Sequence, residues 1–274
     1  MEGKPLGIYN VKTIRYQDSL QVRIFGKPVV SREKIVTSSI KSKRLDNPKS
    51  MKRTDKQIQH CLKTSVNRTV NQIYSISRSN KWEYFITLTI DPQKLDSMDF
   101  DLILNKLNIW TNNLKKRYAP DLKYIFVPEL HKDKKKWHFH GLFTDIGNIP
   151  LVFSGKVCVG KYTYDYARKP YATKIFNLPL WKYGFSTATR IRDSAKSCSY
   201  ITKYISKDLT HVLKNKHRYV SSQNLNTPIE RVYNIDYDVL ADIMRRNMHH
   251  IDYVSNISVR DAGQEISYLE FNND

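Results

Sequence analysis

The stretch of the chain that most constrains its fold is Trp137-His138-Phe139-His140-Gly141-Leu142-Phe143. Side chains alternate between the two faces of a β-strand, so the aromatic residues of this run share one face and the two histidines share the other. The aromatic face predicts burial in a core. The other face then carries two imidazoles close together, an arrangement that suits a divalent metal ion. The alternative is a half-buried strand whose histidines are merely solvated.

An acidic residue lies just upstream of the histidine strand. Residues 122–129 predict a strand, and the polar loop at 131–136 predicts a β-hairpin that joins it to the histidine strand. A turn centred in this loop places Glu129 directly opposite His138, on the same face and with the two Cβ atoms within about 5.5 Å. This placement depends on the register, because a slip of one residue would turn the carboxylate to the other face.

Glu129, His138 and His140 together form an incomplete set of metal ligands. One carboxylate and two imidazoles leave coordination positions open for water or for substrate oxygens. We expect Mg²⁺ or Mn²⁺ at such a site, with zinc conceivable. His131 competes as the third ligand, and its alternative is an exposed loop histidine.

A second group of chemically competent side chains lies further along the chain, in Tyr200-Ile201-Thr202-Lys203-Tyr204-Ile205-Ser206-Lys207. We expect a helix here that begins at Asp193 or Ser194, either of which can cap it, and ends near Lys207. The two tyrosines and two lysines fall within one arc of roughly 100°, opposite an apolar side made of Cys198, Ile201, Ile205 and Leu209. A neighbouring ammonium favours the nucleophilic phenolate form of tyrosine. The alternative is an exposed amphipathic surface.

The rest of the chain predicts a mixture of helices and strands. We expect strands at 8–14, 20–25, 84–90 and 185–191, helices at 56–79 and 99–118, and a tail with one helix at 236–248 and two strands. Residues 31–57 are basic and poor in apolar anchors, which predicts a flexible segment, either a solvated linker or a DNA contact. Residues 144–180 are expected to form a loop-rich insertion with many tyrosines.

The composition limits the partners and the location of the protein. The chain has 274 residues, a hydrophobic fraction of 40% and a formal net charge of +20, which together predict a folded protein that binds a polyanion. No apolar run is long enough to span a bilayer, and the start lacks a secretory signal, so nucleic acid is expected rather than membrane. Cys61, Cys158 and Cys198 lie far apart, as suits a reducing cytoplasm.

Taken in order, these motifs resemble those of the HUH endonucleases, specifically the rolling-circle replication initiators of small phages and plasmids. Phe85-Ile86-Thr87-Leu88-Thr89 looks like the first motif of that family. His138-Phe139-His140, with Glu129 before it, looks like the metal motif. The run from Tyr200 to Lys207 looks like the third motif in its two-tyrosine form. The resemblance covers about residues 81–210.

This resemblance implies an α+β fold, in which a central antiparallel sheet carries the histidine strand between flanking helices, as in HUH and RRM-like domains. The tyrosine helix is then expected to lie over the metal site. We expect a catalytic domain at 81–210, a basic N-terminal extension with short strands and a helix at 1–80, and a small C-terminal α/β tail at 211–274.

The resemblance also implies a mechanism. Tyr200 or Tyr204 would attack a phosphodiester of single-stranded origin DNA, giving a 5′-phosphotyrosine intermediate and a free 3′-OH, and the second tyrosine would allow the strands to be rejoined. Lys203 and Lys207 would hold the phosphate or lower the pKa of a phenol. Mg²⁺ or Mn²⁺ on His138, His140 and Glu129 would offset the charge of the transition state.

The expected partners are single-stranded or hairpin origin DNA together with a host helicase and polymerase, because no GxxxxGK[ST] helicase motif occurs in the chain. Trp181, Tyr183 and Phe185 are candidates for base stacking, with sheet packing as the alternative that we favour for Phe185. Two other functions stay open. One is a transposase or relaxase with the same chemistry, and the other is a non-catalytic DNA-binding protein that controls copy number.

Overall fold

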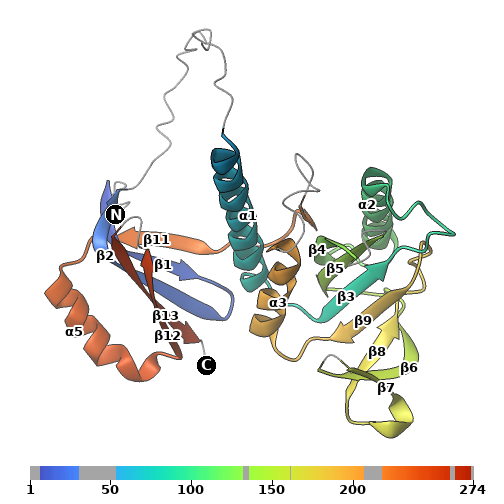
Figure 1. The fold of residues 1–274 in the computed structure, drawn as a ribbon. Coiled ribbons are helices and arrows are strands. Elements are labelled where there is room, and N and C mark those ends of the chain that lie inside the picture. The colour runs from blue at the N-terminus through green and yellow to red at the C-terminus, as the bar shows by residue number, and fades with distance from the viewer. Residues whose placement is uncertain are drawn as a thin grey trace. The chain divides into compact units, whose positions relative to one another are not determined.

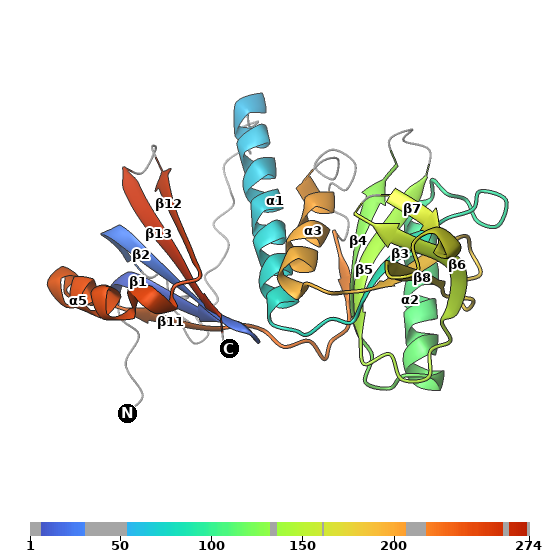
Figure 2. The same cartoon turned by 90° about the horizontal axis from the view of Figure 1, so that it is seen from below.

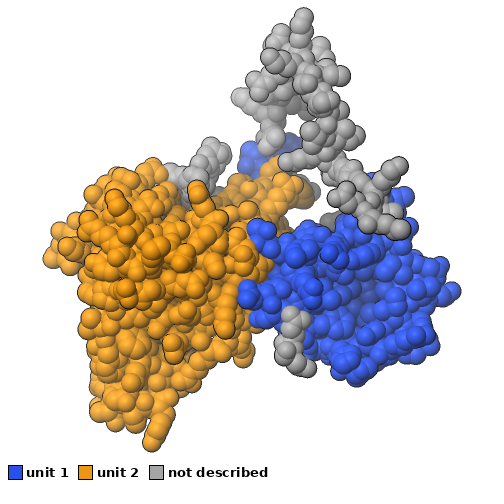
Figure 3. Space-filling model, turned by 180° about the vertical axis from the view of Figure 1, so that it is seen from behind, with its two compact units in different colours: residues 1–58, 227–274 blue, residues 59–226 orange. Residues whose placement is uncertain are grey.

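The computed structural model describes residues 7–30, 54–131, 136–160, 162–206, 218–259 and 263–272. The α+β fold class expected from the sequence is confirmed, because two antiparallel sheets are combined with helices (Figure 1). The chain divides into two compact units, one formed by residues 59–226 and the other by residues 1–58 together with 227–274 (Figure 3). The basic segment expected at 31–57 lies largely outside the described residues.

The two ends of the chain build one unit. Its five-stranded sheet has the order β11-β1-β2-β13-β12, and it is accompanied by helix α5 (Tyr237–Asn247) and the 3₁₀ turn η2 (Met248–His250). The strands are β1 (Ile8–Arg15), β2 (Ser19–Val30), β11 (Ile229–Tyr233), β12 (Tyr253–Val259) and β13 (Gln264–Asn272). From the sequence these ends are expected to be separate extensions, because pairing between strands so far apart has no local signal.

The other unit contains the histidine strand near the middle of an eight-stranded sheet, whose order is β10-β4-β5-β3-β9-β8-β6-β7. The strands are β3 (Tyr84–Thr89), β4 (Lys123–Leu130), β5 (Trp137–Thr144), β6 (Val152–Val159), β7 (Tyr162–Asp165), β8 (Thr173–Asn177), β9 (Ser186–Arg190) and β10 (Val220–Ser221). The helical elements are α1 (Asp55–Arg78), α2 (Phe100–Arg117), η1 (Tyr166–Arg168) and α3 (Ser194–Ser206). Figure 2 shows how they are arranged about the sheet.

The expectation of a loop-rich insertion at 144–180 is wrong. Strands β6, β7 and β8 fill this region and continue the sheet outward from β9. The side chains of β6 are mostly exposed, so the strand lacks the alternation of apolar and polar residues by which strands are recognised. A turn signal was present, since Gly160 directly follows β6 and has φ +59, a backbone conformation that favours glycine.

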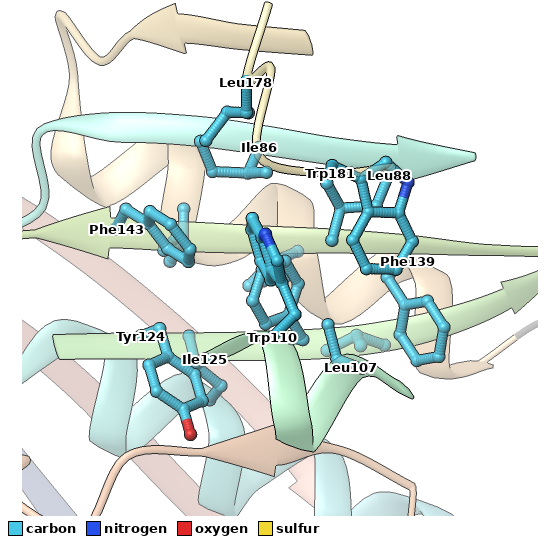
Figure 4. Close-up of a cluster of buried hydrophobic side chains, with 14 of the residues drawn as sticks. Ile86, Leu88, Leu107, Trp110, Tyr124, Ile125, Phe139, Phe143, Leu178 and Trp181 are labelled. Carbon is cyan, nitrogen blue, oxygen red and sulfur yellow. The ribbon is translucent and has the colours of Figure 1, made fainter. Parts of the chain in front are cut away.

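The aromatic face of β5 forms the centre of the core, as its sequence predicts. Trp137, Phe139 and Phe143 are at most 2% exposed, and α2 covers them with Trp110, whose ring centroid lies 6.1 Å from that of Phe143 (Figure 4). Gly141 lies on the same face, where a Cβ would come within 2.4 Å of the Phe126 ring. Burial of this face leaves the histidines on the opposite face of the strand.

Helix α3 packs against β4 and β5. Its described apolar side is buried as expected, because Cys198, Ile201 and Ile205 are all 0% exposed, whereas Leu209 lies outside the described residues. Within the described residues, no helix is long and apolar enough to cross a membrane.

Candidate active site

The expected hairpin register is confirmed. Strands β4 and β5 pair Glu129 with His138, and β3 and β5 pair Thr89 with His138 and Thr87 with His140. Residues opposite one another in an antiparallel ladder point to the same face. The carboxylate, the two imidazoles and two hydroxyls therefore lie on one face across three adjacent strands.

Hydrogen bonds connect these side chains in a pattern that the register alone does not give. His140 Nε2 lies 2.8 Å from Glu129 Oε2, so the carboxylate bonds to the diagonal histidine rather than to its direct neighbour. Thr87 Oγ1 lies 3.2 Å from His140 Nδ1, and Thr89 Oγ1 lies 3.4 Å from His138 Nδ1. Each threonine thus contacts the Nδ1 atom of its histidine and leaves the Nε2 atom for other partners. The alternation along β3 predicts the face of these threonines but not their role.

His138 is the less well satisfied of the two histidines. Its Nε2 atom is buried and has no hydrogen-bond partner among the described residues. The ring of His131 lies roughly parallel to that of His138, with the centroids 5.0 Å apart, although His131 is exposed as well. Burial lowers the pKa of His138, and the nearby charges of His131 and His140 lower it further against the opposing effect of Glu129. His138 therefore favours the neutral form, which is the form that binds a metal ion.

Glu129 is held in its charged form. Burial raises its pKa, but the hydrogen bond from His140 and the charges of His140, His138 and His131 together outweigh this effect, so its pKa lies below the usual value. A carboxylate accepts hydrogen bonds and binds hard cations. Glu129 is suited to both tasks.

The residue types of this group fit a divalent cation, although their present arrangement is not a finished cage. Among the described residues, no group of three His, Cys, Asp or Glu side chains is placed so that it could hold a metal ion as it stands. The reason lies in the bond between His140 and Glu129, which occupies a ring nitrogen and a carboxylate oxygen that would both be ligands. The orphaned Nε2 of His138 is the feature that favours a missing ligand partner.

The two tyrosines of α3 lie beside the histidines. The Tyr204 ring stacks on the His140 ring with a centroid separation of 3.8 Å and an interplanar angle of 15°. Tyr200 meets Tyr204 edge-on at 5.2 Å and also lies 5.5 Å from Phe85. Burial raises the pKa of Tyr204 well above its usual range, and the hydrogen bond and charge of Tyr200 and the charge of Glu129 act in the same direction. In this arrangement Tyr204 is a neutral phenol.

The lysines of the tyrosine helix are less closely engaged. Lys203 is exposed, and its Nζ lies 5.8 Å from the centroid of the Tyr200 ring. Lys207 lies outside the described residues. The expected start of α3 is confirmed, because the Asp193 carboxylate accepts a 2.9 Å hydrogen bond from the backbone N–H of Lys196.

The expectations for the three stacking candidates change with the structure. Trp181 is buried, with its ring centroid 5.2 Å from that of Trp110, and is therefore a core residue. Tyr183 is half-buried. Phe185, for which sheet packing was favoured, is instead 63% exposed, so that preference is wrong. The reason is its position just before β9, at the end of the ladder, where the described part of the chain leaves most of the ring uncovered.

Comparison with known proteins supports a role in replication. Residues 83–209 match the model of a family of replication-associated proteins of the ORF2 type. No curated protein and no solved structure matches the chain. The matched range contains Glu129, both histidines and both tyrosines of the candidate active site. Residues 83–209 are thus similar to replication-associated proteins, and this similarity supports a DNA replication initiator.

Proposed function

We propose that this protein initiates DNA replication by nicking one strand of origin DNA through a tyrosine nucleophile. The observation that carries the proposal is the stacking of Tyr204 on His140 at 3.8 Å, with Tyr200 next to it and the Glu129 carboxylate bonded to the same imidazole. A phenol and a set of metal-binding side chains therefore share one small region. The match to replication-associated proteins and the net charge of +20 support DNA as the substrate.

Glu129, His138 and His140 would hold Mg²⁺ or Mn²⁺. When bound there, the ion would stabilise the negative charge that develops on the phosphate oxygens during strand cleavage. The carboxylate and the imidazole that share a hydrogen bond both become ligands once the Nε2 proton of His140 leaves. Thr87 would then accept a hydrogen bond from the opposite ring nitrogen and orient the imidazole.

The cleavage step forms one bond and breaks another. The phenolic oxygen of Tyr200 or Tyr204 attacks the phosphorus, and the bond from phosphorus to the 3′ oxygen breaks. The phenol loses its proton, and the departing 3′ oxygen gains one, so the products are a 5′-phosphotyrosine and a free 3′-OH. Lys203 would hold the phosphate near Tyr200, where its ammonium group already lies.

Two tyrosines allow a second strand transfer. While one phenol carries the 5′ end of the DNA, the other can attack the regenerated origin. The 3′-OH released in that step can attack the first phosphotyrosine and close the circle. The two rings lie 5.2 Å apart, so both can serve the same region. A polymerase and a helicase of the host would extend the 3′-OH and separate the strands.

The test is to mix the full chain with labelled single-stranded oligonucleotides that tile the DNA of its own genetic element, in the presence of Mn²⁺. We expect an SDS-resistant adduct on one oligonucleotide. The double variant Tyr200→Phe/Tyr204→Phe should abolish it, whereas the control Tyr183→Phe, a half-buried tyrosine of the same unit, should not.

The single tyrosine variants identify the residue that acts first, because only its loss should prevent the first adduct. An adduct that persists in the double variant refutes the tyrosine assignment. Salt-sensitive binding of DNA without any adduct would instead favour the non-catalytic alternative.

A further inference from the structure

Phe185 lies on the same face of the sheet as the candidate active site. The backbone N–H of Thr89 donates a 2.8 Å hydrogen bond to the carbonyl of Phe185. This bond continues the ladder between β3 and β9, in which Thr87 is opposite Thr187. Phe185 therefore lies opposite Thr89 and, by the alternation of side chains, on the face that carries His138. Its side chain is 63% exposed.

The backbone that presents this ring is fixed in place. Asp91 N–H donates to the carbonyl of Tyr183 at 2.9 Å, and the buried Trp181 donates from its ring nitrogen to the carbonyl of Thr89 at 3.1 Å. Gly184 permits this close approach, because a Cβ there would lie 2.1 Å from the carbonyl oxygen of Thr89. Binding a ligand against Phe185 would thus require little ordering of the backbone.

We propose that Phe185 is a stacking platform for a base of single-stranded DNA that lies next to the phosphate bound at the active site. The location rests on the proposed function, whereas the stacking itself does not. Phe185 is separated from His138 by one strand, so their backbones are roughly 10 Å apart across the ladder. Every base has a π-face, so an exposed aromatic ring stacks on single strands with little dependence on sequence.

The first test measures binding of fluorescein-labelled oligothymidylate to the full chain by anisotropy, with EDTA present so that no metal or cleavage contributes. Stacking contributes about 1–3 kcal/mol per base, so Phe185→Ala should weaken binding about 5- to 100-fold, while Phe185→Tyr should retain it. The control is Tyr171→Ala, which removes a ring that is 96% exposed in the same unit. We expect less than about a twofold change for that variant. Unchanged binding in Phe185→Ala, or an equal loss in both alanine variants, would overturn the proposal.

A second test uses fluorescence. The natural tryptophans are all at most 5% exposed, namely Trp82, Trp110, Trp137 and Trp181. Phe185→Trp would therefore add an exposed indole, whose emission should be quenched when oligothymidylate is added, with the same midpoint as the anisotropy change. Binding without quenching would overturn the proposal even if every variant folds normally.

These outcomes separate the platform from the nicking activity. Quenching in a protein that never forms an adduct would leave the platform intact and count against the proposed function. The reverse result is adduct formation with an unchanged KM for DNA in Phe185→Ala and no quenching in Phe185→Trp. It would reject the platform while leaving the proposed function standing.

Discussion

Replacing Thr87 by valine should weaken metal binding at the candidate active site without disturbing the fold. The Thr87 hydroxyl lies 3.2 Å from His140 Nδ1, and Nε2 of the same ring faces Glu129. When Nε2 binds a metal ion, Nδ1 must carry the proton, and the hydroxyl is the group that accepts it as a hydrogen bond. Valine keeps the β-branched shape that suits a strand but removes this acceptor.

The expected loss follows from what such outer contacts contribute elsewhere. Loss of a hydrogen-bond partner behind a ligating histidine typically lowers metal affinity about 10- to 100-fold, which corresponds to about 1.4–2.8 kcal/mol. Thr89 lies 3.4 Å from His138 Nδ1, a longer contact than the 3.2 Å of Thr87, so Thr89→Val should lose less. The order of the two variants is therefore part of the prediction.

The assay is a titration of the full chain with Mn²⁺, followed by calorimetry or by the electron paramagnetic resonance of the free ion. Thr187→Val is the matched control, because Thr187 lies opposite Thr87 on the same face but on the side of β3 away from the histidine strand. We expect the control to bind Mn²⁺ like the unmodified protein. Equal affinity in all three variants would refute the role given to the threonines, and weak binding in the unmodified protein would refute the metal site itself.

Further predictions concern stability and pH. Gly141→Ala would place a methyl group 2.4 Å from the Phe126 ring and should cost about 1–3 kcal/mol, lowering Tm by about 2–12 °C in thermal unfolding; an unchanged Tm would mean that the ring moves freely. Asp193→Ala removes the N-cap of α3 and should lower the free energy of unfolding in urea by about 0.5–2 kcal/mol, while Asp193→Ser should largely preserve it. The folded-state pKa of Glu129 lies below its ordinary value of 4.5, so its contribution to stability is present above that pH and is lost as the pH falls through the lowered pKa. Urea unfolding across the acid range should therefore show a flatter loss of stability in Glu129→Gln, and parallel curves would contradict this.

Local patterns in the sequence predicted the centre of the site well. The period-two alternation of β5 and the short loop before it together limit the register, and the pairing of Glu129 with His138 follows from both. Side-chain contacts are a different matter. The bond from Glu129 to His140 depends on rotamers and on the room beneath α3, neither of which the alternation encodes.

Other features lie beyond any local pattern. The pairing of β2 with β13 joins segments from opposite ends of the chain, and it depends on which apolar faces find each other during folding. Trp181 and Phe185 look alike as aromatic residues near a strand, yet one is buried and the other exposed. The difference arises because Trp181 turns back to cap the carbonyl of Thr89, while Phe185 takes the ladder position on the opposite side of the sheet from the core.

Packing, rather than charge, positions the phenols. Cys198, Ile201 and Ile205 are completely buried, and they fix the rotation of α3 about its axis. Each residue advances the helix by 100°, so Tyr204 lies at the border of this buried stripe and comes down onto His140. Tyr200 lies on nearly the same side one turn earlier, roughly 6 Å along the axis, and thus follows Tyr204 along the same edge. A shift of the apolar stripe by a single residue would rotate both rings away from the histidines while leaving the helix equally stable, so the identity of the buried residues carries the geometry on which the nucleophile depends.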